Sequence, residues 1–534
     1  MRVKVDGVAE ATRHFRSDPI AATFFALGTL LLLVISRLNF RGTEANWDLL
    51  NYHAYVPASL LDGTWFSNFH PAGTQSYLTP YQDLLWWPLI SSLPAPIATT
   101  LIVAVQVSIF VPLGLIVRIV VPTLSAPRAL GLGLIGSSGA MVATELGGTN
   151  GDVLPAIFGA WALYLLLSVL AEPRPRTNIR ITAAGVLVAA AVVTKFAIAF
   201  IAPGLLVFVA ALVLVGKPRA ALLFVVVAAL AGIVFYAPWA IVLQVNDGSP
   251  MFPLYNAIFR APRFPAYNIQ DTRFPVTSIG GLISLPVRLA LGTSATSETP
   301  IRDVRWLMAF LGIGGGMGFT AARIIRGRAR LNWRANLPAL TLVAFWLVSF
   351  VVWAYVFGIQ RYAIILEVLT LPVIAIGIAV MLPRLPGAAS LMVLLVLVAL
   401  VGATTRIADF GRRPMGWAPL FPTETIQPLT QYDAIVIGSD PLAYLSAVTR
   451  NAPGASDRIW LGAPFDGADR AIGMTKIAGK SIGVVFYTNA RPSAVSVAAD
   501  FGLQLTPQCQ SFDNPLASRY MPTGVEVCAA IPSR

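Results

Sequence analysis

Apolar runs of about 20 residues recur along the first three quarters of the chain, and they constrain its fold more than any other feature. An α-helix needs such a run to cross the roughly 30 Å of hydrocarbon in a bilayer. Hydrophobic residues make up 56% of the chain and charged residues only 12%, which excludes a soluble globular protein. The pattern predicts an all-α polytopic membrane protein with about eleven spans. The predicted spans are residues 20–35, 97–121, 130–146, 153–170, 181–193, 196–215, 220–243, 306–322, 337–357, 362–381 and 388–403.

The first apolar run, at residues 20–35, follows Arg13 and Arg16 and resembles the core of a signal peptide. The polar sequence SRLNFR comes after it, where a cleaved signal would have small residues. We therefore predict an uncleaved first span.

Basic residues in the short loops predict the orientation. With the N-terminus in the cytoplasm, every basic cluster of a short loop falls on the cytoplasmic side. These clusters comprise Arg13, Arg16, Arg128, Arg174, Arg176, Arg180, Lys217, Arg219, Arg323, Arg326, Arg328, Arg330, Arg334 and Arg384. Topology and contact with anionic lipids then explain most of the net charge of +13, so no nucleic-acid partner is expected. The predicted location is a cytoplasmic (inner) membrane, with the N-terminus in the cytoplasm.

An odd number of spans places residues 406–534 outside the cytoplasm, after a transmembrane domain at residues 1–405. This C-terminal segment is long enough to form a domain. Its short apolar runs predict strands at 434–438, 481–487 and 524–530, with helices at 441–450 and 493–502. We expect a small extracytoplasmic α/β domain.

Both cysteines of the chain, Cys509 and Cys528, lie in this C-terminal segment. Thiols persist as disulfides in an oxidising exterior compartment. The pair therefore predicts a disulfide, and it supports the orientation independently of the charges. Two free buried cysteines are the alternative.

Three polar segments interrupt the apolar pattern, and all three fall on the exterior side. The first loop, residues 37–93, contains Asp48 within the sequence NWDLLNYH. The second, residues 244–305, carries arginines interleaved with aromatic residues, and the short segment 145–152 joins two spans. Loops this long in a compact protein are usually functional. The polar chemistry of the chain is thus predicted on one face.

The strings NWDLLNYHAY, PAGTQSYLTPYQDLLWWP, GSPMFPLYNAIFRAPRFP and GIQRYAIILE resemble a group of multi-span bacterial proteins of inferred glycosyltransferase function. An acidic residue soon after the first span, beside an amphipathic stretch at 47–61, resembles more broadly the GT-C superfamily of membrane glycosyltransferases. The resemblance implies juxtamembrane helices in the first loop, a polyprenyl-phosphate sugar as donor, and Asp48 as the catalytic carboxylate. The superfamily often pairs two acids, whereas here Glu44 and Asp48 are four residues apart. The requirement for a divalent cation is therefore left open.

Glycosyl transfer from a lipid phosphate needs a carboxylate that takes the proton of the acceptor hydroxyl. It also needs cations that neutralise the departing phosphate. Asp48 is the predicted general base, and a helix-capping or solvated Asp is the alternative. A single displacement would invert the anomeric carbon.

Five other side chains are candidates for acidic support or acceptor binding: Glu44, His53, Asp83, Glu145 and Asp152. Glu44 lies one helical turn before Asp48, so the two carboxylates could share a face and a divalent ion. His53 follows Asp48 by five residues and needs a bend in the helix to reach that face. Solvated loop acids are the alternative for Glu44, Glu145 and Asp152, and a marker of membrane re-entry is the alternative for Asp83.

Lys195 and Arg361, at the exterior boundary, are the first candidates for binding the donor phosphate. An ammonium between two apolar runs is costly unless it snorkels or meets an anion, and the planar fork of Arg suits phosphate. Arg260 and Arg263 in the second loop are predicted to close over the donor. Anchoring on lipid headgroups is the alternative for all four.

The sequence is also compatible with two other functions. A transporter or flippase of polyprenyl-linked sugars would share the hydropathy, but transporters place their polar sites near the bilayer midplane. A non-catalytic envelope-assembly protein would tolerate the loss of Asp48. The leading prediction is a glycosyltransferase that acts on a polyprenyl-phosphate sugar donor and a glycan or lipid acceptor of the cell envelope.

Overall fold

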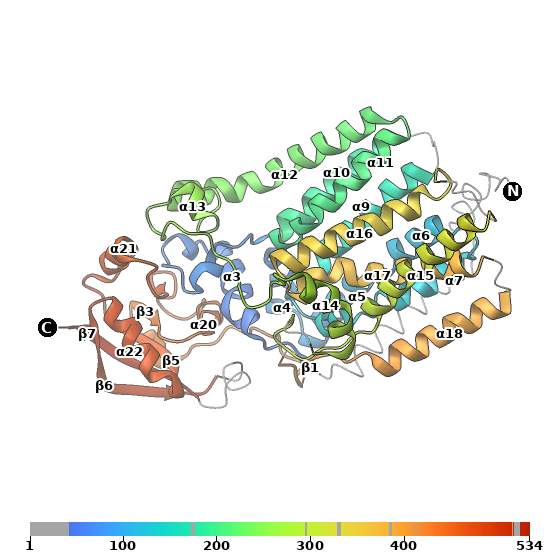
Figure 1. Ribbon diagram of the computed structural model, residues 1–534. Coiled ribbons are helices and arrows are strands. Elements are labelled where there is room, and N and C mark those ends of the chain that lie inside the picture. Colours follow the sequence, from blue (N-terminus) through green and yellow to red (C-terminus); the bar gives the residue numbers. More distant parts are fainter. Residues whose placement is uncertain are drawn as a thin grey trace.

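The computed structural model describes residues 42–171, 177–293, 296–327, 333–383, 387–409, 411–414, 416–514, 516 and 524–533. Figure 1 shows a helical bundle and a sheet domain at opposite ends of the molecule, with the short helices of the first loop between them. The predicted first span at residues 20–35 lies outside the described residues.

Within the described ranges, eight helical segments are long and apolar enough to cross a membrane, and each coincides with a predicted span. They are α5–α6 (Ala95–Val107 and Phe110–Val120), α9 (Val153–Ala171), α10 (Thr177–Thr194), η4–α11 (Phe196–Ile201 and Ala202–Leu214), α12 (Pro218–Asp247), α15 (Arg305–Ile325), α16 (Leu337–Val356) and η5–α17 (Gln360–Ala363 and Ile364–Met381). The run at 388–403 lies in α18 (Gly387–Thr404). The protein is therefore a multi-pass membrane protein.

The structure differs from the prediction at residues 130–146, which form two short helices, α7 (Ala126–Gly136) and α8 (Ala140–Glu145), instead of one span. The Glu367 carboxylate of α17 accepts hydrogen bonds from the amides of Met141 (3.0 Å) and Val142 (3.1 Å). The Asp303 carboxylate accepts one from the amide of Ala140 (3.1 Å). These acids satisfy amides at the start of α8 that would otherwise need partners in a preceding turn, so a new helix begins there.

The first loop folds as a series of short elements beside the bundle. They are β1 (Gly42–Thr43), η1 (Leu49–His53), α3 (Tyr55–Leu61), η2 (Thr64–Phe66), η3 (Gly73–Tyr77) and α4 (Tyr81–Ser92). The second loop contains α13 (Asn256–Phe259) and α14 (Ile279–Leu291). The short helices expected in the first loop are thus present.

The C-terminal sheet has five strands in the order β4-β3-β5-β7-β6. Its elements are α19 (Gln427–Thr430), β3 (Ala434–Ile437), α20 (Tyr444–Val448), β4 (Ile459–Leu461), α21 (Gly467–Ile477), β5 (Ile482–Tyr487), η6 (Thr488–Ala490), α22 (Arg491–Asp500), β6 (Leu503–Phe512) and β7 (Val525–Pro532). The strand β3 pairs in parallel with β4 and β5, while β7 is antiparallel to β5 and β6. The strands β3 and β5 are buried along their whole length, as expected for apolar strands covered on both faces.

Two strand-like pairings join the C-terminal segment to the first loop. The strand β2 (Arg413–Pro414), in the linker before the domain, pairs antiparallel with β1 at the start of the loop. Phe69 pairs in parallel with Leu461, its amide donating to the Trp460 carbonyl (2.8 Å), and its ring lies in the core of the sheet domain. The first loop is therefore held between the bundle and the sheet domain.

Candidate active site

The segment after Asp48 is a π-helix, and this sets the direction of its side chains. The amide of Ala54 donates to the carbonyl of Leu49, five residues earlier (3.1 Å). Residues five apart lie closer to one face in a π-helix, which has wider turns, than in an α-helix. His53 consequently lies within electrostatic range of Asp48. The spacing of the two residues predicted that His53 would need a bend in the helix to approach Asp48, and the π-helix is that departure from an α-helix.

Asp48 forms an ion pair with Arg361, a residue of η5. The distance from Nη1 of Arg361 to Oδ2 of Asp48 is 2.5 Å, and the two side chains are 16% and 15% exposed. Nη2 of Arg361 also lies 3.6 Å from Glu298 in the second loop. Burial by itself raises the pKa of Asp48, but Arg361 and His53 lower it more, so the pKa lies below its usual value.

His53 and Asp83 form a second buried pair. Nδ1 of His53 lies 2.6 Å from Oδ1 of Asp83, which is in the first turn of α4, and the side chains are 7% and 6% exposed. Nε2 of His53 is buried and has no hydrogen-bond partner among the described residues. Burial by itself lowers the pKa of His53, but the Asp83 carboxylate raises it more, so the pKa lies above its usual value.

Lys195 lies between α10 and η4 and is paired with Asp152. Its ammonium is 2.7 Å from Oδ2 of Asp152 and donates to the carbonyl of Asn150 (2.9 Å). It also lies 5.3 Å from the ring centre of Tyr362, and the Arg361 guanidinium lies 5.4 Å from the same centre. The two predicted phosphate-binding cations therefore lie within cation–π distance of the same aromatic ring.

Glu145 and Glu44 lie beside this cluster and are almost fully buried, at 2% and 3% exposure. The Glu145 carboxylate lies beside the Asp152 carboxylate and interacts with it. Glu44 accepts from the amide of Thr149 (2.5 Å) and from Nδ2 of Asn46 (2.9 Å). Asp152 is 6% exposed. The alternative that these three acids are solvated is wrong.

The other two predicted cations lie elsewhere. Arg263 donates through Nε to Asp469 of the sheet domain (3.1 Å) and through Nη1 to Asp247 at the end of α12. Arg260 is exposed on the second loop. Neither has a contact with Asp48 in the part of the chain that the structure describes. The residue patterns also missed Glu298 and Tyr362, although Tyr362 adjoins Arg361 and is an aromatic residue at the start of a span.

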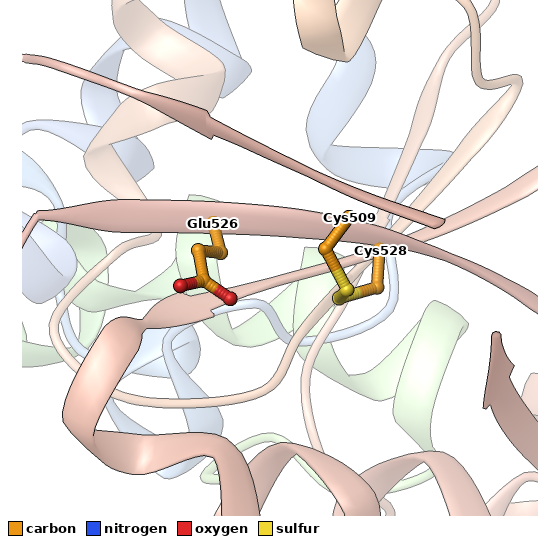
Figure 2. A group of neighbouring side chains, drawn as sticks. All are labelled: Cys509, Glu526 and Cys528. Atoms are coloured by element: carbon orange, nitrogen blue, oxygen red, sulfur yellow. A yellow bond between two sulfur atoms is a disulfide. The ribbon is translucent and has the colours of Figure 1, made fainter. Parts of the chain in front are cut away.

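One group of described side chains has the spacing of metal ligands: Cys509, Glu526 and Cys528 (Figure 2). The two cysteines are joined in a disulfide across β6 and β7, so no thiolate is left to bind a metal. The predicted disulfide is confirmed, and this group is a covalent link between two strands.

No family model matches this chain, and no curated protein matches its sequence. Solved structures do match its fold. Apo ArnT from Cupriavidus metallidurans is 16% identical, with a TM-score of 0.54 over 95% of this chain and 98% of that one. The apo oligosaccharyltransferase from Archaeoglobus fulgidus is 14% identical, with a TM-score of 0.50 over 89% of this chain and 71% of that one. The chain therefore shares its overall fold with these two proteins.

Proposed function

We propose that this protein is a membrane glycosyltransferase that transfers a sugar from a polyprenyl-phosphate donor to a glycan or lipid acceptor of the cell envelope. The observation that carries the proposal is the buried cluster beside the bundle, where Asp48 lies with Arg361 and within electrostatic range of Lys195. A carboxylate and two cations are the groups that such a transfer needs. The GT-C fold supports this choice.

In the proposed reaction Asp48 removes the proton of the acceptor hydroxyl as its oxygen attacks the anomeric carbon. The bond from that carbon to the phosphate oxygen breaks, and its electron pair leaves with the polyprenyl phosphate. Arg361 and Lys195 neutralise the charge that develops on the phosphate. One displacement of this kind inverts the anomeric carbon.

The proposed orientation places this cluster on the exterior side of the bacterial cytoplasmic membrane. The basic loops between spans support it, because cytoplasmic loops collect Lys and Arg. The disulfide of the sheet domain also supports it, because disulfides persist in oxidising compartments. The donor would then enter sideways from the outer leaflet.

The test is sugar transfer by the purified full-length protein in lipid nanodiscs. A panel of radiolabelled polyprenyl-phosphate sugars is supplied with a membrane extract as the source of acceptor, and wild type is compared with Asp48→Asn. Labelled product from wild type that disappears in the variant is the expected result. Transfer that survives Asp48→Asn would refute the role of Asp48. Failure with every donor, together with movement of labelled lipid across vesicles, would favour a flippase.

A further inference from the structure

The His53 imidazole is a buried titratable group that the proposed reaction leaves unused. Its Nδ1 atom lies 2.6 Å from Asp83, and its Nε2 atom is buried with no hydrogen-bond partner among the described residues. His53 ends the π-helix η1 that begins after Asp48, and the two side chains lie within electrostatic range of each other. A carboxylate bonded to one ring nitrogen selects the tautomer that carries its proton there, which leaves Nε2 as a free base.

We propose that His53 holds the proton that Asp48 removes from the acceptor, and that Asp83 is the positioning residue for this step. The inference rests on the proposed glycosyl transfer and adds a second proton-handling group to the same site. His53 acts at the reacting centre, whereas Asp83 acts through His53.

Asp48 is a poor final holder of the proton because the paired Arg361 stabilises its anionic form. The acceptor O–H bond breaks as the new glycosidic bond forms, and the proton passes to the Asp48 carboxylate. It then passes to Nε2 of His53, which becomes an imidazolium held by the Asp83 carboxylate. Asp48 returns to its anionic pair with Arg361, and His53 releases its proton to water after the products leave. Charge and atoms balance with no further reactant.

Four charged groups act on His53 from the elements around it. Asp83 in α4, Asp48 at the start of η1 and Glu44 before it are anions, while Lys195 is a cation. Burial, the largest single influence, lowers the pKa of His53, but Asp83 and then Asp48 together outweigh it and hold that pKa above its usual value. Because protonated His53 cannot take another proton, kcat/KM should fall as the pH drops through that raised pKa.

The test is the pH dependence of kcat/KM in wild type, His53→Gln and Asp83→Asn. We expect His53→Gln to lower kcat about 100-fold and to leave KM for the donor nearly unchanged. It should also remove the acidic limb of the profile, which is the fall of kcat/KM at low pH. Asp83→Asn should move that limb to lower pH, because it removes the anion that raises the pKa of His53. His70→Gln is the control, since His70 is a buried histidine at the sheet-domain junction and its loss should leave the limb in place.

If wild type transfers sugar and the acidic limb of the kcat/KM profile keeps its position in His53→Gln, the proton-holding role of His53 and Asp83 is overturned. The glycosyltransferase proposal is then left intact. A uniform loss of rate at every pH in both variants also overturns the proton-holding role, because a purely structural role has that result. Absence of transfer by wild type at every pH overturns both proposals.

Discussion

At the residue scale, Asp48 and Arg361 form an ion pair. The proposed reaction, however, assigns Asp48 to the acceptor hydroxyl and Arg361 to the donor phosphate. The guanidinium of Arg361 has five N–H donors, of which one contacts Asp48. In the proposed reaction Asp48 and the donor phosphate would therefore compete for the same cation.

Replacing Asp48 with Asn should abolish sugar transfer and also strengthen the binding of polyprenyl phosphate. The neutral amide no longer competes with phosphate for the Arg361 guanidinium. We expect Kd for polyprenyl phosphate to fall about tenfold, equivalent to about 1.4 kcal/mol. Equilibrium binding of radiolabelled polyprenyl phosphate to the protein in nanodiscs measures this change.

Asp271→Asn is the matched control for that measurement. Asp271 is an acid in the second loop that lies within electrostatic range of Arg361 but is paired with Arg273. Its replacement removes the same charge without releasing Arg361, so Kd should change by much less. Equal tightening in the two variants would mean that net charge, and not the ion pair, controls binding.

Residue types and loop positions were enough to select most members of this cluster from the sequence, but not their pairing. Asp48, Lys195 and Arg361 were recognisable as polar groups at span boundaries. The contact between His53 and Asp83 depends on a π-turn that no residue pattern in NWDLLNYH specifies. Arg263 was predicted to bind the donor because the sequence gives no sign of its partner. That partner, Asp469, is 206 positions away in a different domain.

At the scale of elements, the start of α8 depends on acids from two other segments. Glu367→Ala should leave the amides of Met141 and Val142 without their acceptor, at a cost of about 1–3 kcal/mol for each buried group. Because α8 carries Glu145 into the candidate site, transfer should fall as well. Thermal unfolding in detergent and sugar transfer measure the two effects.

Glu367→Gln separates the hydrogen bonds of Glu367 from its charge. The amide oxygen keeps an acceptor for α8, so this variant should melt between wild type and Glu367→Ala. Glu424→Gln, at an exposed position, should melt like wild type. An equal loss in both Glu367 variants would show that the charge, through Arg305 and Asp303, matters more than the capping of α8.

Elements with strong periodic patterns were predictable, and those shaped by tertiary contacts were not. Eight spans and the strands β3, β5 and β7 followed from apolar runs alone. The strand β4 has three residues, and β6 is a largely polar edge strand, so neither produces an apolar run. The break at Ser137–Gly139 was hidden because the acids that cause it, Asp303 and Glu367, belong to distant segments.

The disulfide is the main covalent constraint on the sheet of the C-terminal domain. Cys509→Ala combined with Cys528→Ala opens a loop of 19 residues and should cost the domain about 3 kcal/mol, if the effect is mainly entropy of the unfolded chain. Protease resistance of the sheet domain at increasing temperature measures this. Wild type treated with reductant should behave like the double variant, and unchanged resistance in both would contradict the expected role.

At the scale of the whole molecule, the sheet domain is joined to the first loop by a buried polar cluster. Nε2 of His70 donates to the carbonyl of Ala463 (3.1 Å), and Nδ1 lies 3.3 Å from the hydroxyl of Tyr77. Asp469 is 3.3 Å from His70, but its charge is already balanced by Arg263 at 3.1 Å. Burial first, and then Arg263, hold the pKa of His70 well below its usual value, so the docked histidine is neutral.

Docking of the sheet domain should therefore weaken as the pH falls below about 6.5, the usual pKa of histidine. In the undocked state His70 regains that pKa and binds a proton that the docked state excludes, so acid favours undocking. The slope contributed by this one group reaches at most about 1.4 kcal/mol per pH unit. Hydrogen exchange at the amides of Phe69 and Gly462, which bond across the junction, measures this pH dependence.

The pKa of Asp469 is raised by burial and acts in the opposite direction, so His70→Gln in the same experiment isolates the contribution of the histidine. Wild type should lose protection faster than His70→Gln as the pH falls from 7 to 5, and parallel curves would show that His70 does not control docking.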